Sequence, residues 1–248
     1  MARELIASRV GKEIFRDGDK IYKVFSAAKY SKADILNEAL NHSRVEETDL
    51  LVPSLLDISH DDTTRTIILD YVDGKTLQEL MEENPKKTAK YLEMFVDLQI
   101  LMHSKSNPKL GRLRDKMHTK VTNSGIEATI RYELHIRIDN QSKKEKLLHG
   151  DFNPSNVILR PDGKLYIIDW SHATQGEPAA DAARTYLLFK LEKRDDLAEK
   201  YLKLFCTRSD TAKQSVQQWM PIVAASRFGL KIPEEKEFLE SWVQIIGT

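Results

Sequence analysis

Residues 147–170 have the sequence LLHGDFNPSNVILRPDGKLYIIDW, which contains two short β-type segments separated by a strong turn signal. The segments 157–159 and 165–168 are rich in branched and aromatic residues, which favour strands. The Pro-Asp-Gly at 161–163 between them is typical of a turn. We therefore predict an antiparallel hairpin here.

Folding this hairpin brings polar side chains together. Asn156 lies six residues before Asp162 at the turn centre, and Asp169 lies seven residues after it. Antiparallel pairing then places Asn156 and Asp169 within a residue or two of direct opposition. Asp151 belongs to the loop just before the hairpin. Hard oxygen ligands at an open site suit Mg²⁺, so we predict Asn156 and Asp169 as magnesium ligands.

The spacing of these residues matches a known catalytic loop. Asp151, four residues and Asn156 have the spacing of the kinase loop in which the Asp accepts the proton of the acceptor hydroxyl. Gly150 stands where a protein kinase carries Arg, and Trp170 follows Asp169 where it carries Phe. His-Gly-Asp-x₄-Asn followed by Ile-Asp-Trp resembles the signature of the aminoglycoside phosphotransferase and choline kinase superfamily. The resemblance implies a protein-kinase-like fold, with Asp151 as the catalytic residue.

The resemblance extends toward the N-terminus. Lys23 resembles the family's phosphate-binding lysine, and Glu38, in the first predicted helix, its ion-pair partner. The run LDYVDG at 69–74 resembles the hinge between the lobes, whose backbone would contact adenine. In this chain the hinge residues are Asp70, Tyr71 and Val72. The segment 9–14 must then cover the nucleotide, although it has a single glycine, Gly11, where the kinase pattern has three.

Three further residues near the catalytic loop are expected to support it. We predict that His149 braces the loop, because Asp151 already occupies the acceptor position. Asp181 resembles the aspartate that supports the fold in the family, and Arg184, one helical turn later, is expected to pair with it.

The remaining pattern predicts an α+β protein. Before residue 73 we expect a hairpin with a type I′ turn at Asp17-Gly18, two more strands at 55–58 and 66–69, and one helix. That helix begins with a capping box of Ser31 and Asp34. Leu36, Ala39, Leu40 and Ser43 follow the capping box at helical spacing.

Helices dominate the rest of the chain. We expect one beginning at Asn84, with Tyr91, Phe95, Leu98 and Met102 on its buried face. Others are expected at 181–191, 195–205 and 211–227, and a last one carries Phe238, Trp242 and Ile245. Together these elements predict a bilobal fold. Residues 1–73 would form the nucleotide-binding lobe, a small antiparallel sheet with one helix, and residues 74–248 a larger, mainly helical lobe.

The composition excludes several other classes of protein. The 248 residues carry 38 basic and 38 acidic side chains, so no net charge attracts nucleic acid or an anionic membrane. No stretch approaches the roughly 18 apolar residues of a membrane helix. The single cysteine, Cys206, excludes an internal disulfide and favours a cytoplasmic protein.

The sequence thus predicts a kinase that uses ATP and Mg²⁺ to phosphorylate a hydroxyl group of a small molecule. The alternatives are a nucleotide-binding pseudokinase that regulates a partner, and a protein kinase. The sequence does not define the acceptor, which could be an aminoglycoside, an amino alcohol, a sugar or a related metabolite. It also does not define the oligomeric state.

Overall fold

The structure, a computed structural model, describes residues 3–244. Contacts divide the chain into two compact units, each built from two stretches of sequence. The first unit contains the residues up to Thr88 together with Pro154–Ala173, and the second contains Ala89–Asn153 and the residues from Thr174 onward. These units partition the chain differently from the predicted lobes 1–73 and 74–248, because the hairpin after Asp151 joins the first unit. The functional boundary at residue 73 stays a prediction.

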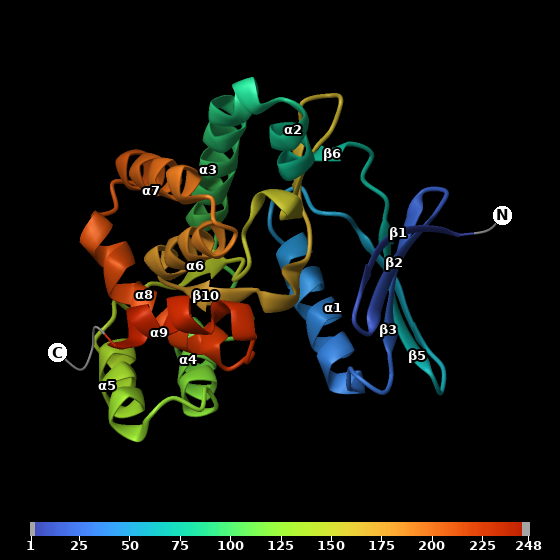
Figure 1. Ribbon diagram of the computed structural model, residues 1–248. Coiled ribbons are helices and arrows are strands. Elements are labelled where there is room, and N and C mark those ends of the chain that lie inside the picture. The colour runs from blue at the N-terminus through green and yellow to red at the C-terminus, as the bar shows by residue number, and fades with distance from the viewer. Residues whose placement is uncertain (1–2, 245–248) are drawn as a thin grey trace. The chain divides into compact units, whose positions relative to one another are not determined.

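The first unit contains a five-stranded antiparallel sheet (Figure 1). The strand order is β1-β2-β3-β5-β4, so β3 is central and pairs with both β2 and β5. The strands are β1 (Glu4–Arg9), β2 (Lys12–Asp17), β3 (Lys20–Ser26), β4 (Leu55–His60) and β5 (Thr64–Asp70). The predicted strands are therefore all present, and β1 is an additional edge strand.

The turn between β2 and β3 differs from the prediction. Asp17 pairs with Lys20, so the two-residue loop consists of Gly18 and Asp19. Of these two only Gly18 has a positive φ, of 59°. A type I′ turn needs positive φ at both positions, whereas a type II′ turn needs it at the first alone, where glycine is favoured. The predicted type I′ turn is therefore wrong.

Helix α1 (Lys32–Glu46) begins as the sequence predicts. The Ser31 hydroxyl accepts a hydrogen bond from the Asp34 amide, and the Asp34 carboxylate accepts one from the Ser31 amide, at 3.2 and 2.8 Å. Such a reciprocal capping box satisfies two amide donors that would otherwise lack partners at the helix start.

Of the residues at helical spacing in α1, Ala39 is buried but the two leucines are not. Leu36 and Leu40 are 47% and 48% exposed, while Ile35 and Ala39 are buried with Phe25 and Ile67 of the sheet. The positions 35, 39 and 42 keep the helical spacing, but the stripe is shifted by one residue from Leu36 and Leu40. The hydrophobic residue types alone therefore do not identify the buried face of this helix.

The predicted hairpin after Asp151 is confirmed. Strands β8 (Val157–Leu159) and β9 (Leu165–Ile167) pair antiparallel, with Val157 opposite Ile167. The Ile168 amide donates to the Asn156 carbonyl at 3.0 Å. Asn156 is thus opposite Ile168, and Asp169 is one residue beyond, as the spacing predicted.

A third short strand, β6 (Lys75–Thr76), pairs with β8 and completes a three-stranded sheet. Gly74 makes the close approach possible. Its φ is 151°, and a Cβ at this position would lie 2.5 Å from the Leu159 carbonyl oxygen. Only glycine fits there.

Helix α2 (Leu77–Glu83) was missed by the sequence analysis. It has its own capping box, in which Thr76 and Glu79 exchange hydrogen bonds. The predicted helix start at Asn84 is instead a 3₁₀ turn, η1 (Pro85–Lys87), and the Asn84 side chain makes no capping hydrogen bond. The Thr-x-x-Glu pattern at 76–79 is the signal that could have located this helix.

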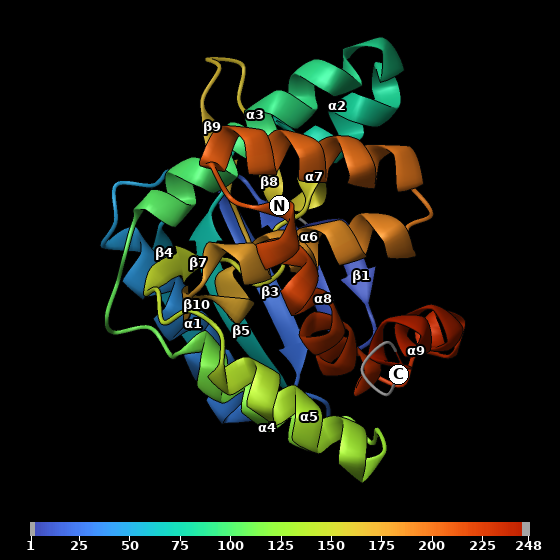
Figure 2. The same cartoon turned by 90° about the vertical axis from the view of Figure 1, so that its left-hand side faces the viewer.

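The second unit is mainly helical (Figure 2). Helix α6 packs against α7 and α8, and α8 also packs against α4, α5 and α9. The helices are α3 (Thr88–Ser104), α4 (Leu113–Thr122), α5 (Ala128–Asp139), α6 (Pro178–Leu191), α7 (Asp195–Ser209), α8 (Lys213–Phe228) and α9 (Lys236–Gln244). Two short antiparallel strands complete it, β7 (Lys146–Leu148) and β10 (Thr174–Gly176). The α+β prediction is confirmed.

Aromatic side chains fill the core of this unit. The predicted stripe of α3, which includes Tyr91, Phe95 and Met102, is buried. The Phe95 ring stacks on Phe152 with ring centroids 4.4 Å apart. The last helix buries Leu239 and Val243, and the predicted Ile245 lies outside the described residues.

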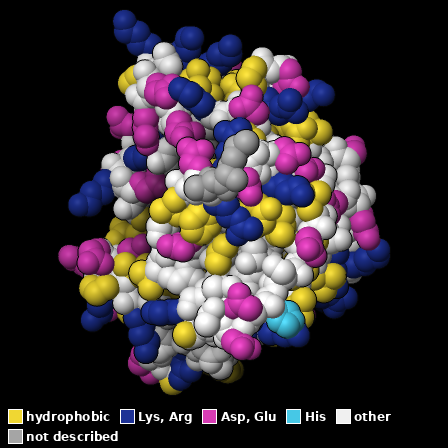
Figure 3. All heavy atoms as spheres, turned by 90° about the vertical axis from the view of Figure 1, so that its right-hand side faces the viewer, with side chains coloured by type: hydrophobic (Ala, Val, Ile, Leu, Met, Phe, Trp, Pro, Cys, Tyr) yellow, Lys and Arg dark blue, Asp and Glu magenta, His cyan; other side chains and the backbone are white. Residues whose placement is uncertain are grey.

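The surface charges are mixed, as the composition predicts. Figure 3 shows Lys and Arg side chains interspersed with Asp and Glu over the face that carries the β-sheet. Among residues 3–244, no helix combines the length and the apolar character needed to cross a membrane.

Candidate active site

A cavity of about 400 Å³ lies within the first unit. Its lining includes most of the residues that the sequence analysis assigned to nucleotide and metal binding. These residues are Lys23, Asp70, Tyr71, Val72, Asn156 and Asp169. Residues far apart in the sequence therefore meet at one cavity.

One part of the cavity is apolar. Ile21 and Leu69 of adjacent strands line it together with Ile158 and Ile168 of the hairpin. Aliphatic side chains from two sheets thus form walls that suit a flat, largely apolar group.

The hinge segment offers one backbone donor beside these walls. The Asp70 amide donates to the Ser54 carbonyl at 3.0 Å, and the Tyr71 amide donates to the Asp19 carbonyl at 2.7 Å. Among the described residues, the Val72 amide has no backbone acceptor. Val72 is therefore the hinge residue whose N–H can meet a ligand.

Lys23 lies at the polar part of the cavity, with a side chain that is 8% exposed. Its ammonium group is 2.9 Å from Glu38 Oε1 and 3.2 Å from Asp169 Oδ1. Burial alone would lower the pKa of Lys23, but the two carboxylates outweigh it and raise the pKa above the ordinary value of 10.5. Lys23 is therefore a fixed positive charge, and the predicted pairing with Glu38 is present.

Lys12 is a second cation at this site, which the sequence analysis did not assign. Its Nζ lies 3.7 Å from Asp169 Oδ2 and 3.9 Å from Glu38 Oε1. Burial and the neighbouring Lys23 lower the pKa of Lys12, although the carboxylates partly oppose this. Two ammonium groups thus share two carboxylates at one end of the cavity.

The β2–β3 register explains this arrangement. Ile14 is opposite Lys23 and Lys12 is opposite Phe25, so Lys12 and Lys23 lie on the same face of the sheet. The hairpin was predicted, and counting outward from its turn would have found Lys12. The segment 9–14 contains the end of β1, a two-residue turn at 10–11 and the start of β2, with Arg9 paired to Lys12.

Asn156 and Asp169 provide oxygen atoms that fit a magnesium ion. Both line the cavity, and Mg²⁺ is usually bound through one or two protein carboxylates plus water and substrate phosphates. Asp169 has a φ of 63°, in the left-handed region that costs energy for any residue except glycine. Among residues 3–244, no group of three His, Cys, Asp or Glu side chains forms a larger metal site. The donor set therefore suits a metal that also takes ligands from a bound substrate.

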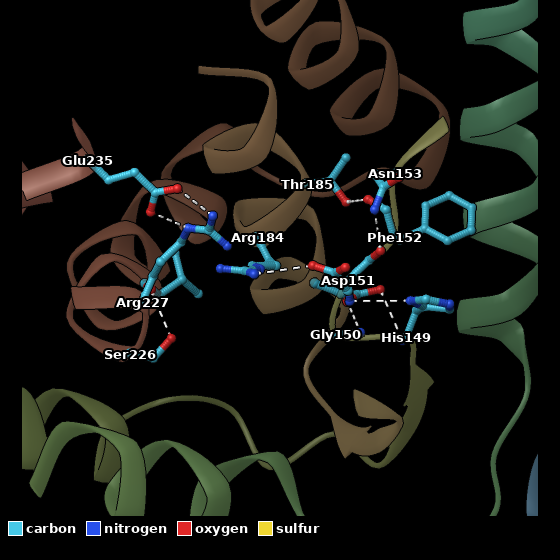
Figure 4. Close-up of polar contacts among 12 residues, drawn as sticks. His149, Gly150, Asp151, Phe152, Asn153, Arg184, Thr185, Ser226, Arg227 and Glu235 are labelled. Carbon is cyan, nitrogen blue, oxygen red and sulfur yellow. Dashed lines mark hydrogen bonds and ion pairs between the residues drawn. The ribbon is translucent and has the colours of Figure 1, made fainter. Parts of the chain in front are cut away.

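Asp151 lies in the second unit, in a loop held by several hydrogen bonds (Figure 4). The Asp151 amide donates to His149 Nδ1 at 3.2 Å, and the Gly150 amide donates to the Asp181 carboxylate at 2.7 Å. Gly150 has a φ of 78°, which glycine adopts readily. His149 and Asp181 therefore brace the loop, as predicted.

Arg184 pairs with Asp151 and not with Asp181 as predicted. Its Nη2 lies 3.1 Å from Asp151 Oδ1. Asp181 instead contacts His103 Nε2 at 3.1 Å, in addition to the loop amides. Although burial opposes it, these partners lower the pKa of Asp181. The Asp181 carboxylate thus binds the loop backbone, and Arg184 contacts Asp151 instead.

Comparison with protein families identifies the class of this chain. A model of the phosphotransferase enzyme family, APH, matches residues 14–219, which is most of the sequence. The chain belongs to this phosphotransferase family. No curated protein sequence matches this phosphotransferase significantly.

Solved structures show that this phosphotransferase has the fold of aminoglycoside phosphotransferases. A thermostable mutant of aminoglycoside phosphotransferase APH(4)-Ia, as a ternary complex with ADP and hygromycin B, superposes with a TM-score of 0.72 at 15% identity, covering 99% of this chain and 92% of that chain. APH(3'')-Id from Streptomyces rimosus ATCC10970 gives 0.66 at 17% identity, covering 90% and 92%. The predicted protein-kinase-like fold of the aminoglycoside phosphotransferase and choline kinase superfamily is therefore confirmed.

Proposed function

We propose that this phosphotransferase transfers the γ-phosphate of ATP to a hydroxyl group of a small molecule in a reaction that requires Mg²⁺. The observation that carries the proposal is the cavity in which Lys23 contacts both Glu38 and Asp169, with Asn156 in the same lining. Support for the nucleotide comes from a solved structure with this fold that contains ADP. We also propose residues 1–73 and 74–248 as the nucleotide and acceptor lobes.

In this proposal the apolar walls hold the adenine. The Val72 amide donates a hydrogen bond to the base, and the backbone of Asp70 and Tyr71 fixes the hinge through the two hydrogen bonds described above. Lys23 contacts the α- and β-phosphates, and Glu38 orients its ammonium group.

Lys12 contacts nucleotide phosphates that a glycine-rich loop contacts in other kinases. Such a loop covers the phosphates with backbone amides. The tight β1–β2 turn offers few amides, but Lys12 lines the same cavity with a mostly buried ammonium group. We therefore assign Lys12 to the nucleotide phosphates as a second cation.

Asn156 and Asp169 would hold Mg²⁺. When bound, the ion would supply positive charge that neutralises the negative charge developing during transfer. Lys23 and Lys12 would then exchange part of their contact with Asp169 for contact with the phosphates.

Asp151 accepts the hydrogen bond of the acceptor hydroxyl. The hydroxyl oxygen forms a bond to the γ-phosphorus as the bond from that phosphorus to the ADP oxygen breaks, and the hydroxyl proton passes to the Asp151 carboxylate. Arg184 and the braced loop hold this carboxylate in place.

An ADP-release assay across aminoglycosides, amino alcohols, sugars and related metabolites tests the proposal. We expect release that depends on both acceptor and Mg²⁺, and its loss in Asp151→Asn but not in Asp196→Asn, an exposed aspartate on α7. ATP binding without transfer to any acceptor would favour the pseudokinase instead, and transfer to proteins would favour a protein kinase. The cytoplasmic location stays a prediction from the single cysteine.

A further inference from the structure

Four basic side chains in the second unit interact with one another, and three of them also interact with Asp151. We define this basic cluster as Lys116 and Lys120 of α4, Arg184 of α6 and Arg227 of α8. Helices α4 and α6 both pack against α8, and Lys116 and Lys120 are one helical turn apart on the same face of α4. In Figure 4, Arg184 lies between Asp151 and Arg227.

Both arginines of the basic cluster pair with carboxylates. Arg184 pairs with Asp151 at 3.1 Å, and Arg227 donates two hydrogen bonds to Glu235, one of them at 2.6 Å. Asp181 is already committed to His103 and to the loop amides. Asp151 also acts on both lysines, and Asp181 acts on Lys116, so the same two carboxylates are shared among several cations and positive charge is in surplus.

Lys120 shows this surplus of positive charge most clearly. It makes no hydrogen bond or ion pair with any described residue, and it is only partly exposed. Burial lowers its pKa, as do Arg184 and, less strongly, Arg227. Burial also lowers the pKa of Lys116, to about 7, and Lys120 and Arg184 contribute to this shift.

Arg184 also has a donor group that can bind a ligand. Its Nε is buried and has no hydrogen-bond partner among the described residues, although buried N–H groups nearly always have one. Mutually repelling cations and an unsatisfied buried donor cost stability. An anion bound among them would relieve both costs.

We propose that the acceptor of this phosphotransferase carries a negatively charged group, a phosphate or a carboxylate, and that the basic cluster binds it beside Asp151. This inference rests on the proposed function, since it takes Asp151 as the residue that meets the acceptor hydroxyl. A polycationic acceptor would meet repulsion from Lys116, Lys120 and Arg227. An aromatic cage for a quaternary amine is also not formed by Trp219, which is 3% exposed.

Matched sets of acceptors test the proposal. Each pentose, hexose or three-carbon polyol is offered to the wild-type enzyme in neutral, amino, carboxylate and phosphate forms, together with an aminoglycoside. Binding is measured calorimetrically in the presence of a non-hydrolysable ATP analogue, and transfer by ADP release. We expect an anionic form to bind at least about tenfold more tightly than its neutral and amino forms, as for a charge-assisted contact.

Variants assign the effect to the cluster. Lys120→Met should raise the KM for the anionic acceptor about tenfold and leave the KM for ATP unchanged. Lys200→Met, at an exposed lysine of α7, should change neither. Comparing the affinities for the carboxylate and phosphate forms of one acceptor shows which anion the cluster prefers.

The possible outcomes separate this inference from the proposed function. Preferred transfer to amino forms or to the aminoglycoside would overturn the inference and keep the proposed function. Tight, Lys120-dependent binding of anions without transfer would support the anion site and contradict the proposed function. A rise in the KM for ATP in Lys120→Met, or no binding of any anion, would overturn the inference.

Discussion

The two charged regions of this phosphotransferase differ in their balance. In the cavity of the first unit, Lys12 and Lys23 face the carboxylates of Glu38 and Asp169, so the charges match in number. Around Asp151 in the second unit, Lys116, Lys120 and Arg184 share the carboxylates of Asp151 and Asp181, so the cations outnumber the carboxylates. A balanced set can exchange partners when a metal–nucleotide complex binds, whereas an unbalanced set requires a ligand of opposite charge. We therefore propose that the first region binds the nucleotide and metal, and that the second selects the acceptor.

The largest effect is expected from removing a member of the balanced set. Asp169→Ala takes away a proposed metal ligand and leaves Lys12 and Lys23 with one carboxylate. We expect turnover to fall by about 10²-fold or more, the range for lost electrostatic stabilisation. ADP release at saturating Mg²⁺ measures this, and Asp162→Ala in the hairpin turn is the control. Wild-type turnover in Asp169→Ala would show that this cavity does not hold the metal.

A smaller effect is expected for Lys12. Lys12→Met removes one of two cations, so the KM for ATP should rise about tenfold while the acceptor KM stays constant. Lys20→Met, at an exposed position of the same sheet, provides the control. An unchanged KM for ATP in Lys12→Met would show that Lys12 only packs between the carboxylates.

The basic cluster should give the reaction a dependence on pH. The pKa of Lys116 is lowered to about 7, so this group is charged below that pH and neutral above it. Lys120, Arg184, Asp151 and Asp181 are the charged groups that act on it. Affinity for an anionic acceptor should therefore fall as the pH rises through about 7.

Calorimetry in buffers of different ionisation enthalpy checks this directly. Because a bound anion favours charged Lys116, binding near neutral pH should take up protons. Lys116→Met should abolish the uptake, and Lys116→Arg, which stays charged, should abolish it while keeping the affinity. Unchanged uptake in both variants would assign the titration to another group.

The smallest effect concerns stability. Lys120→Met removes a repelling charge, so the ligand-free variant should melt at a temperature equal to or a few degrees above that of the wild type. Thermal denaturation with and without an anionic acceptor measures this, and the wild type should gain more from the acceptor. A marked loss of stability in the ligand-free variant would indicate that Lys120 has a structural role.

The sequence predicted the balanced region better than the unbalanced one, for a physical reason. Asn156 and Asp169 are related by one local hairpin, whose turn and strand period fix their register. The position of Lys12 is likewise fixed by a hairpin, since the register of β2 and β3 places it on the same face as Lys23. Lys12 was missed because this register was not extended to the first residue of β2. Spacing along the sequence was thus sufficient to predict which residues meet in the cavity of the first unit.

The basic cluster depends on how α4, α6 and α8 pack, which no local spacing encodes. Arg184 is one turn from Asp181 in the sequence, yet it pairs with Asp151. The shifted face of α1, with Leu36 and Leu40 exposed, has a similar origin, because tertiary packing decides which stripe is buried. The proposed acceptor site therefore could not be predicted from the sequence.

The most direct test places Lys12→Met and Lys120→Met in one ADP-release assay with the preferred anionic acceptor, varying ATP and acceptor in turn. We expect a crossed result, in which Lys12→Met raises only the KM for ATP and Lys120→Met raises only the KM for the acceptor. If both variants raise the same KM, or if neither raises any, the assignment of one region to the nucleotide and the other to the acceptor is contradicted.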